Sequence, residues 1–241
     1  MRKVWLVALV ALAACGKSAP ANHAAVAVNP APADGATAAP PARPAKLAQI
    51  FTPDVLGANV AWLETVTGPA FRTDGETRLY KVDGCEVIVG AGKGKIDNIG
   101  IQNYSAACSF PIAQYFATGG APTAPQVPTF GDLKAALGGH FAATCLRLCG
   151  NAADPVVSLA YQGSHADNFN DLYAGVPIGP SDDAQNAYTA WGNALVSKYG
   201  ENAVDDGEYA SEDMLQDVAA ADFAKVRPTI IRVGSGLSGP D

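Results

Sequence analysis

The chain has 241 residues, of which 49% are hydrophobic and 16% are charged, a balance typical of a folded globular protein. It carries 16 basic and 23 acidic residues, a formal net charge of −7. This acidic balance argues against nucleic acid or an anionic membrane surface as a partner, because both attract clustered Lys and Arg.

The first residues predict a secretory leader. Two basic residues precede an apolar run over residues 4–14, which is too short to span a bilayer. The run ends in Leu12-Ala13-Ala14-Cys15, which resembles the lipobox of bacterial lipoproteins, in which the cysteine receives acyl chains such as palmitate. The resemblance implies a signal peptide over residues 1–14 and a lipid anchor at Cys15. An ordinary secreted protein with a cysteine in its leader is the alternative.

The residues after the lipobox predict a location and a tether. Gly16 stands where an Asp would resemble an inner-membrane retention signal, so we expect the outer membrane, with the domain facing the periplasm. Residues 15–47 are rich in Ala and Pro and predict a disordered linker. Residues 48–241 form the predicted periplasmic domain, in which no segment is apolar for long enough to span a bilayer.

Patterns in this domain predict an α+β fold, with helices packed on an antiparallel β-sheet. The helix-strands-helix-strands order indicates two related halves, over residues 48–120 and 128–241. The expected elements, in chain order, are a helix over 52–67 capped by Thr52, strands over 77–82, 85–89 and 96–101 in a meander, a short helix capped by Ser109, a helix from Thr129, strands within 155–161 and 169–176, a helix from Ser181 to Gly200, a helix within 211–226, and a strand over 229–233.

Four cysteines remain for the domain: Cys85, Cys108, Cys145 and Cys149. An even number in an oxidising compartment predicts two structural disulfides. A straight strand would separate Cys145 and Cys149 by about 13 Å, beyond bridging distance, but a turn or loop brings them together. We prefer Cys145 with Cys149 and Cys85 with Cys108. The alternative is a redox-active thiol pair, although its spacing is not the usual C-x-x-C.

Other motifs give weaker signals, and no enzyme, cofactor or metal site is predicted. The glycine-rich run 90–95 joins two predicted strands, so a hairpin turn is favoured over a phosphate loop. The stretch 163–165 contains Ser next to His and is interpreted as a solvated loop, and Asp167 and Asp171 form no arguable catalytic pair. The acidic run 201–213 resembles a calcium loop only in part, since Val204 occupies a ligand position, and a solvated loop is favoured.

A further pattern lies within residues 54–101 and consists of Gly57, Leu63-Glu64, Gly68-Pro69, Tyr80, Val82, Gly84-Cys85, Val87, Lys95-Ile96 and Ile99. This pattern is similar to the small outer-membrane-assembly lipoproteins and to the wider fold of the β-lactamase-inhibitor proteins. The resemblance implies a helical segment on an antiparallel sheet and a protein partner. It implies no individual contact residue.

These observations predict an outer-membrane lipoprotein that acts as a non-catalytic protein-binding or assembly module for another envelope protein. One alternative is an inhibitor of a cell-wall or antibiotic hydrolase, in which an acidic loop over 205–213 would meet a basic active-site rim. The other is a periplasmic thiol oxidoreductase that uses Cys145 and Cys149.

Overall fold

A computed structural model describes residues 45–116, 127–146, 149, 155–179, 182–201 and 215–237. Every described residue belongs to one compact unit of the chain, Pro41–Asp241. None of the described helices is long and apolar enough to cross a membrane. The elements in chain order are α1 (Ala45–Ile50), η1 (Pro53–Val55), α2 (Val60–Thr67), β1 (Arg72–Asp74), β2 (Thr77–Val82), β3 (Cys85–Gly92), β4 (Lys95–Gln102), η2 (Ile112–Tyr115), α3 (Phe130–Leu137), β5 (His140–Ala143), β6 (Val156–Tyr161), η3 (His165–Asp167), β7 (Asp171–Pro177), α4 (Asp182–Tyr199), α5 (Gln216–Asp222) and β8 (Ile230–Gly234).

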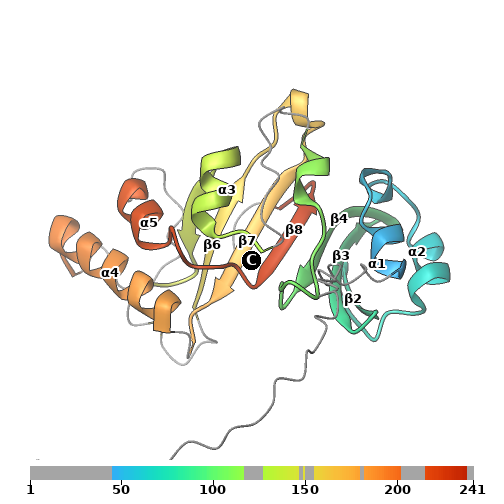
Figure 1. Cartoon of the computed structure of the whole chain (residues 1–241), viewed down its shortest axis with the longest axis horizontal. Coiled ribbons are helices and arrows are strands. Elements are labelled where there is room, and N and C mark those ends of the chain that lie inside the picture. Colours follow the sequence, from blue (N-terminus) through green and yellow to red (C-terminus); the bar gives the residue numbers. More distant parts are fainter. Residues whose placement is uncertain are drawn as a thin grey trace, which may run out of the picture. The chain divides into compact units, whose positions relative to one another are not determined.

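Eight of the described strands form one antiparallel sheet in the order β1-β2-β3-β4-β8-β7-β6-β5 (Figure 1). The predicted meander β2-β3-β4 forms one side, and a second meander, β5-β6-β7, forms the other. The last strand, β8, lies between β4 and β7. Each meander follows a helix and runs from the outside of the sheet toward its centre. The predicted α+β class, with helices packed on an antiparallel sheet, is confirmed.

One face of this sheet forms the hydrophobic core. Directly paired residues share a face, and the strand register aligns a fully buried row across seven strands. This row consists of Tyr80, Val87, Ile101, Ile231, Ala174, Leu159 and Phe141. The same core cluster contains buried side chains from each of α1 to α5, such as Leu63 of α2 and Trp191 of α4. The helices therefore pack on this face.

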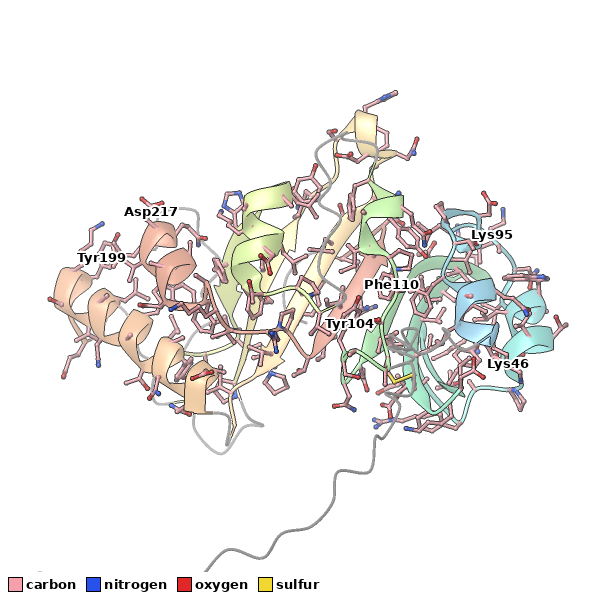
Figure 2. The ribbon with its side chains drawn as sticks, in the orientation of Figure 1. Lys46, Lys95, Tyr104, Phe110, Tyr199 and Asp217 are labelled. Carbon is pink, nitrogen blue, oxygen red and sulfur yellow. A yellow bond between two sulfur atoms is a disulfide. The ribbon has the colours of Figure 1, made fainter. Side chains whose placement is uncertain are left out.

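A cluster of aromatic side chains extends the core at the segment that follows β4. Figure 2 shows Tyr104 and Phe110 next to each other, and their ring centroids lie 5.7 Å apart in an edge-on arrangement. The Tyr104 hydroxyl donates to the Phe110 carbonyl at 2.9 Å. Phe110 also stacks on Phe51, at 4.3 Å between centroids. These contacts join the segment between β4 and η2 to the end of α1.

The single helix predicted over residues 52–67 is wrong. The structure has a short 3₁₀ turn, η1, and a separate helix, α2, whose cap is Asn59 instead of Thr52. Gly57 lies between them with a φ of +83°, and its N–H donates to the Ile96 carbonyl. Because the N–H of Val60 donates to Gly94, the backbone here bonds to the β3–β4 hairpin and cannot continue a helix.

Four further elements differ from the prediction. The helix α1 starts inside the segment assigned to the linker, and β1 and β5 were not predicted. The short helix expected after Ser109 is a 3₁₀ turn, η2, which follows Pro111 and has no side-chain cap. The helix from Thr129 is confirmed: the Thr129 hydroxyl accepts from the Asp132 N–H at 3.1 Å, and the Asp132 carboxylate accepts from the Thr129 N–H at 2.8 Å.

Candidate functional site

The second face of the sheet, which we call the outer face, is separate from the core. Successive side chains of a strand point to opposite faces of the sheet, so the residues of the outer face alternate with the core residues along each strand. Ile88 and Ala142 are buried hydrophobic residues of this face, and neither belongs to the core cluster. Two paired rows define the outer face: Arg72, Leu79, Ile88, Gly100, Arg232, Tyr173, Ala160 and His140, and beside it Lys81, Glu86, Gln102, Ile230, Gly175, Ser158 and Ala142.

Small residues occupy the centre of the outer face, and two large side chains lie across them. A Cβ atom added to Gly100 would clash with the carbonyl oxygen of Ile231 and would lie 2.6 Å from Cγ of Arg232. A Cβ added to Gly175 would lie 2.8 Å from the ring of Tyr173. The two glycines therefore allow Arg232 and Tyr173 to lie close against the sheet. Glycine inside a strand often marks such a close approach.

A buried amide holds Arg232 in place. Asn98, which is 6% exposed, accepts hydrogen bonds through Oδ1 from Nη2 of Arg232 at 2.6 Å and from the N–H of Gly90 at 3.2 Å. Its Nδ2 donates to the carbonyl of Ser235 at 3.1 Å. A guanidinium fixed in this way loses less conformational freedom when it binds a partner.

Charged and polar residues surround this centre. Arg72 and Asp74 lie on β1 at one end of the sheet, and the ion pair between Lys81 and Glu86 lies on β2 and β3. His140 is exposed on β5 at the other end. A small or apolar centre with Tyr and Arg, inside a charged rim, is the usual composition of a protein–protein interface. An ordinary solvated face of an antiparallel sheet instead carries polar side chains throughout.

A shallow pocket of about 250 Å³ opens on the outer face at its β1–β4 end. Leu79 and Ile88 supply its apolar lining, and the remaining lining residues are Arg72, Asp74, Thr77 and Gln102. This volume lies below the range of roughly 300–1,000 Å³ that is common for small-molecule sites. The pocket therefore suits one side chain of a protein partner better than a whole metabolite.

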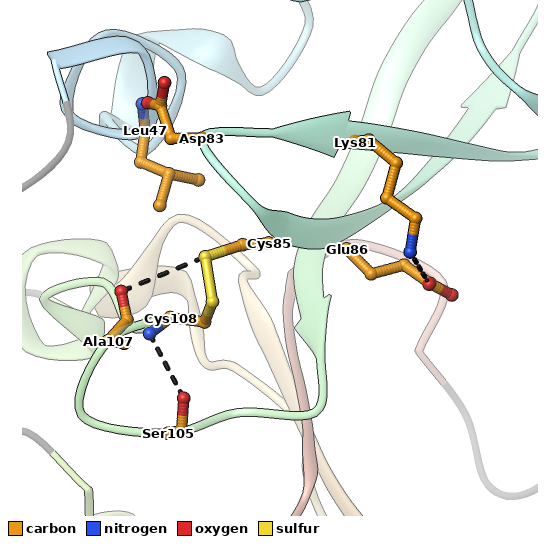
Figure 3. The surroundings of a disulfide bond; sticks show 8 residues. All are labelled: Leu47, Lys81, Asp83, Cys85, Glu86, Ser105, Ala107 and Cys108. Atoms are coloured by element: carbon orange, nitrogen blue, oxygen red, sulfur yellow. Dashed lines mark hydrogen bonds and ion pairs between the residues drawn. A yellow bond between two sulfur atoms is a disulfide. The ribbon is translucent and has the colours of Figure 1, made fainter.

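The structure joins the four cysteines in the predicted pairs, Cys85–Cys108 and Cys145–Cys149. Figure 3 shows the first, which ties the start of β3 to the loop where the Cys108 N–H donates to the Ser105 hydroxyl. In the second, Sγ of Cys149 lies 3.4 Å from the hydroxyl of Tyr188 on α4. Both disulfides connect segments of the fold, and neither lies among the residues that define the outer face.

The other predicted positions divide into three groups. The run 90–95 spans the predicted β3–β4 hairpin, whose turn consists of Lys93 and Gly94, at φ values of +51° and +78°. Ser164 and His165 are exposed and the Ser164 hydroxyl donates to Asp167 instead of facing the histidine. Cys15, Ser181 and residues 202–213, which include the suggested calcium ligands, lie outside the described residues.

Asp167, which follows the predicted solvated loop over residues 163–165, is fully buried. Its carboxylate accepts a hydrogen bond from the Tyr161 hydroxyl at 2.6 Å. This bond, followed by burial, raises the pKa of the Tyr161 hydroxyl. Asp171 accepts from the backbone N–H groups of Gly163 and Leu237, so both carboxylates support loops beside β7.

In the part of the chain that the structure describes, no group of three or more His, Cys, Asp or Glu side chains is arranged to hold a metal ion. Comparison with protein-family models, curated proteins and solved structures gives no match for this chain. No activity or partner is therefore transferred from a relative, and the outer face is the basis for a functional proposal.

Sequence reasoning missed Arg232, Tyr173 and the other outer-face residues. Their alignment depends on pairing between strands far apart in the chain, such as Gly100 with Arg232. The available signal was the presence of Gly100 and Gly175 inside predicted strands, where glycine has no advantage for strand formation.

Proposed function

We propose that this protein is a non-catalytic protein-binding or assembly module of the bacterial cell envelope. The observation that carries the proposal is the outer face, with its small and apolar centre, an Arg232 held by Asn98, a Tyr173 ring against Gly175, and a charged rim. Arg and Tyr are the residue types most often responsible for binding energy at protein interfaces. The adjoining pocket would accept an apolar side chain of the partner.

The location is part of the same proposal. Cys15 carries the lipid, the segment after it is the tether, and the domain acts in the periplasm at the outer membrane. Several acyl chains on one cysteine hold a protein firmly, whereas a single chain is marginal. The resemblance to outer-membrane-assembly lipoproteins supports an envelope protein as the partner. A Cys15→Ser variant is expected to leave the membrane fraction; retention of that variant, together with an uncleaved leader in the unsubstituted protein, would contradict this part.

Site-specific crosslinking in intact envelopes tests the binding surface. A photoreactive phenylalanine analogue replaces Tyr173 on the outer face of the full-length chain, and a matched variant carries it at Tyr199, which is 42% exposed on α4. We expect a discrete crosslinked protein from position 173 and none from position 199. Adding Ala160→Arg, which places a long charged side chain in the centre of the face, should abolish the product.

The identity of the crosslinked protein then separates the functions. Assembly proteins or peptidoglycan-associated proteins would support the proposal. Recovery of a single hydrolase would favour the inhibitor alternative, and mixed disulfides trapped by Cys149→Ala would favour the thiol oxidoreductase. Equal crosslinking from positions 173 and 199 would rule out the outer face as the binding surface.

A further inference from the structure

The two end strands of the sheet differ in whether a side chain forms hydrogen bonds with the backbone at their free edges. On β5, the side-chain amide of Gln216 accepts from the N–H of Phe141 at 2.7 Å and donates to its carbonyl at 2.9 Å, so a side chain occupies this edge. On β1, all three residues are exposed, and β2 is its one strand partner among the described residues. An exposed edge presents backbone donors and acceptors to another strand.

Thr73 carries the outward-facing backbone groups of β1. The two-residue turn at 75–76 makes Asp74 and Thr77 a pair, and Arg72 pairs with Leu79 two residues further on. In an antiparallel ladder, hydrogen-bonded and non-hydrogen-bonded pairs alternate. The two residues that flank a two-residue hairpin turn form a hydrogen-bonded pair, so Asp74–Thr77 and Arg72–Leu79 are of this kind and Thr73–Arg78, between them, is not. Thr73 therefore directs its N–H and its carbonyl away from β2.

The side chains beside Thr73 are complementary to themselves. Arg72 and Asp74 lie on the outer face, and Nη2 of Arg72 is 3.8 Å from Oδ2 of Asp74. Their side chains are 66% and 81% exposed. If a second β1 lies antiparallel with its Thr73 opposite this Thr73, each Arg72 faces Asp74 of the other copy. Opposite charges directly across a strand pair are stabilising, and like charges are destabilising.

We propose that β1 binds β1 of a second copy of this chain, antiparallel and centred on Thr73, so that the two sheets join edge to edge. Short, charged edge strands usually prevent such pairing, but a mixed Arg and Asp pair does not repel its own copy in this register. Phe71, which is 52% exposed beside β1, adds apolar surface at the join. The two-fold axis is perpendicular to the sheet, so the two outer faces continue on the same side. This inference is independent of the proposed function.

Disulfide trapping in the full-length chain tests the pairing. A hydrogen-bonded antiparallel pair has Cα atoms about 5.5 Å apart, within the range for a disulfide. Thr73→Cys is therefore expected to yield a disulfide-linked dimer under mild oxidation, detected by intact mass without reduction. The matched control is Thr65→Cys, an exposed threonine on α2, which reports random collision.

Charge exchange provides the decisive comparison. Adding R72D or D74R to Thr73→Cys places like charges across the join and should slow crosslinking by about tenfold or more. Mixing the R72D and D74R proteins restores both opposite-charge pairs, so a crosslinked heterodimer should form at the original rate. Lys198→Asp, which makes the same charge change as R72D but on α4, should have no effect.

Two results would overturn the proposal. One is crosslinking at position 73 that is no faster than at position 65. The other is a mixture of R72D and D74R proteins that crosslinks no faster than either alone. The mixture is scored only when the R72D and D74R proteins each unfold cooperatively in denaturant, so that a failure to restore crosslinking reflects the join and not misfolding.

Discussion

The side-chain amide of Gln216 forms two hydrogen bonds with the backbone of Phe141, at 2.7 and 2.9 Å, and so acts in place of a neighbouring strand at the edge of β5. Gln216 is the first residue of α5. The contact therefore connects this helix to the end of the sheet across 75 positions of sequence. It satisfies backbone groups that would otherwise be open to another chain.

Gln216→Ala should destabilise the fold and expose the β5 edge. Loss of both bonds is expected to lower the free energy of unfolding by about 1–3 kcal/mol and to increase aggregation at high concentration. Denaturant unfolding and light scattering measure the two effects. Gln216→Glu is the matched control: it keeps an acceptor for the Phe141 N–H but loses the donor to the carbonyl, so an intermediate effect is expected. Unchanged stability in Gln216→Ala would mean that the contact contributes nothing to the fold.

Asp83 should be important for the position of α1. Its carboxylate accepts from the N–H groups of Lys46 and Leu47, at 3.0 and 3.1 Å, and it is drawn with Leu47 in Figure 3. Capping by a carboxylate typically contributes about 0.5–2 kcal/mol. Asp83 also has a φ of +51°, which Asn tolerates better than Ala. We expect Asp83→Ala to lower the free energy of unfolding, measured in denaturant, more than Asp83→Asn does. Equal losses of stability in the two variants would indicate that the turn conformation has no part in the effect.

The two disulfides should contribute unequally to stability. Cys85–Cys108 closes a span of 23 residues and Cys145–Cys149 a span of four. Since loop entropy in the unfolded chain grows with span, the chain-entropy estimate is about 3 kcal/mol for the first bridge and about 2 kcal/mol for the second. Replacing each pair by Ser in separate variants and comparing unfolding midpoints measures the difference. A larger loss from the shorter bridge would show that packing near Cys149 and Tyr188 outweighs the entropy of the unfolded chain.

Local signals predicted the elements that depend on nearby residues. The hairpin between β2 and β3 has Asp83-Gly84 at its turn, both with positive φ, and the capping box at Thr129 begins α3. Strand patterns identified β2, β3, β4, β6, β7 and β8 because their apolar residues face the core at regular intervals. Interactions between residues close in sequence are visible without a structure.

Elements that depend on distant partners could not be predicted in this way. The cap of α1 comes from Asp83, 37 positions after Lys46. The segment around Gly57 leaves the helix because its N–H bonds to Ile96, on a strand that forms later in the chain. The outer face has the same origin: Arg232 reaches Asn98 across 134 positions. Sequence patterns show which residues are buried, but strand register decides which of them share a face.

Tyr80 should make the protein sensitive to alkaline pH. Its side chain is fully buried on β2, and its hydroxyl donates to Oε1 of Glu64 at 3.3 Å. Burial, followed by the nearby Glu64 carboxylate, raises the pKa of Tyr80 from 10.0 to about 12. Between these values the unfolded chain loses the phenolic proton while the folded chain keeps it, so the free energy of unfolding is unaffected below pH 10 and falls as the pH rises toward 12.

Tyr80→Phe tests this dependence, because it removes the ionisable group and keeps the ring. Denaturant unfolding at a series of alkaline pH values should show a slope that is shallower than in the unsubstituted protein by at most about one proton. Burial also raises the pKa of Tyr188, so part of the slope should remain in Tyr80→Phe and decrease further when Tyr188→Phe is added. Tyr199→Phe, at an exposed position on α4, serves as the control for removal of a tyrosine hydroxyl outside the core. If Tyr80→Phe has the same slope as the unsubstituted protein, Tyr80 ionises equally in the folded and unfolded chains, and burial on β2 does not protect its proton.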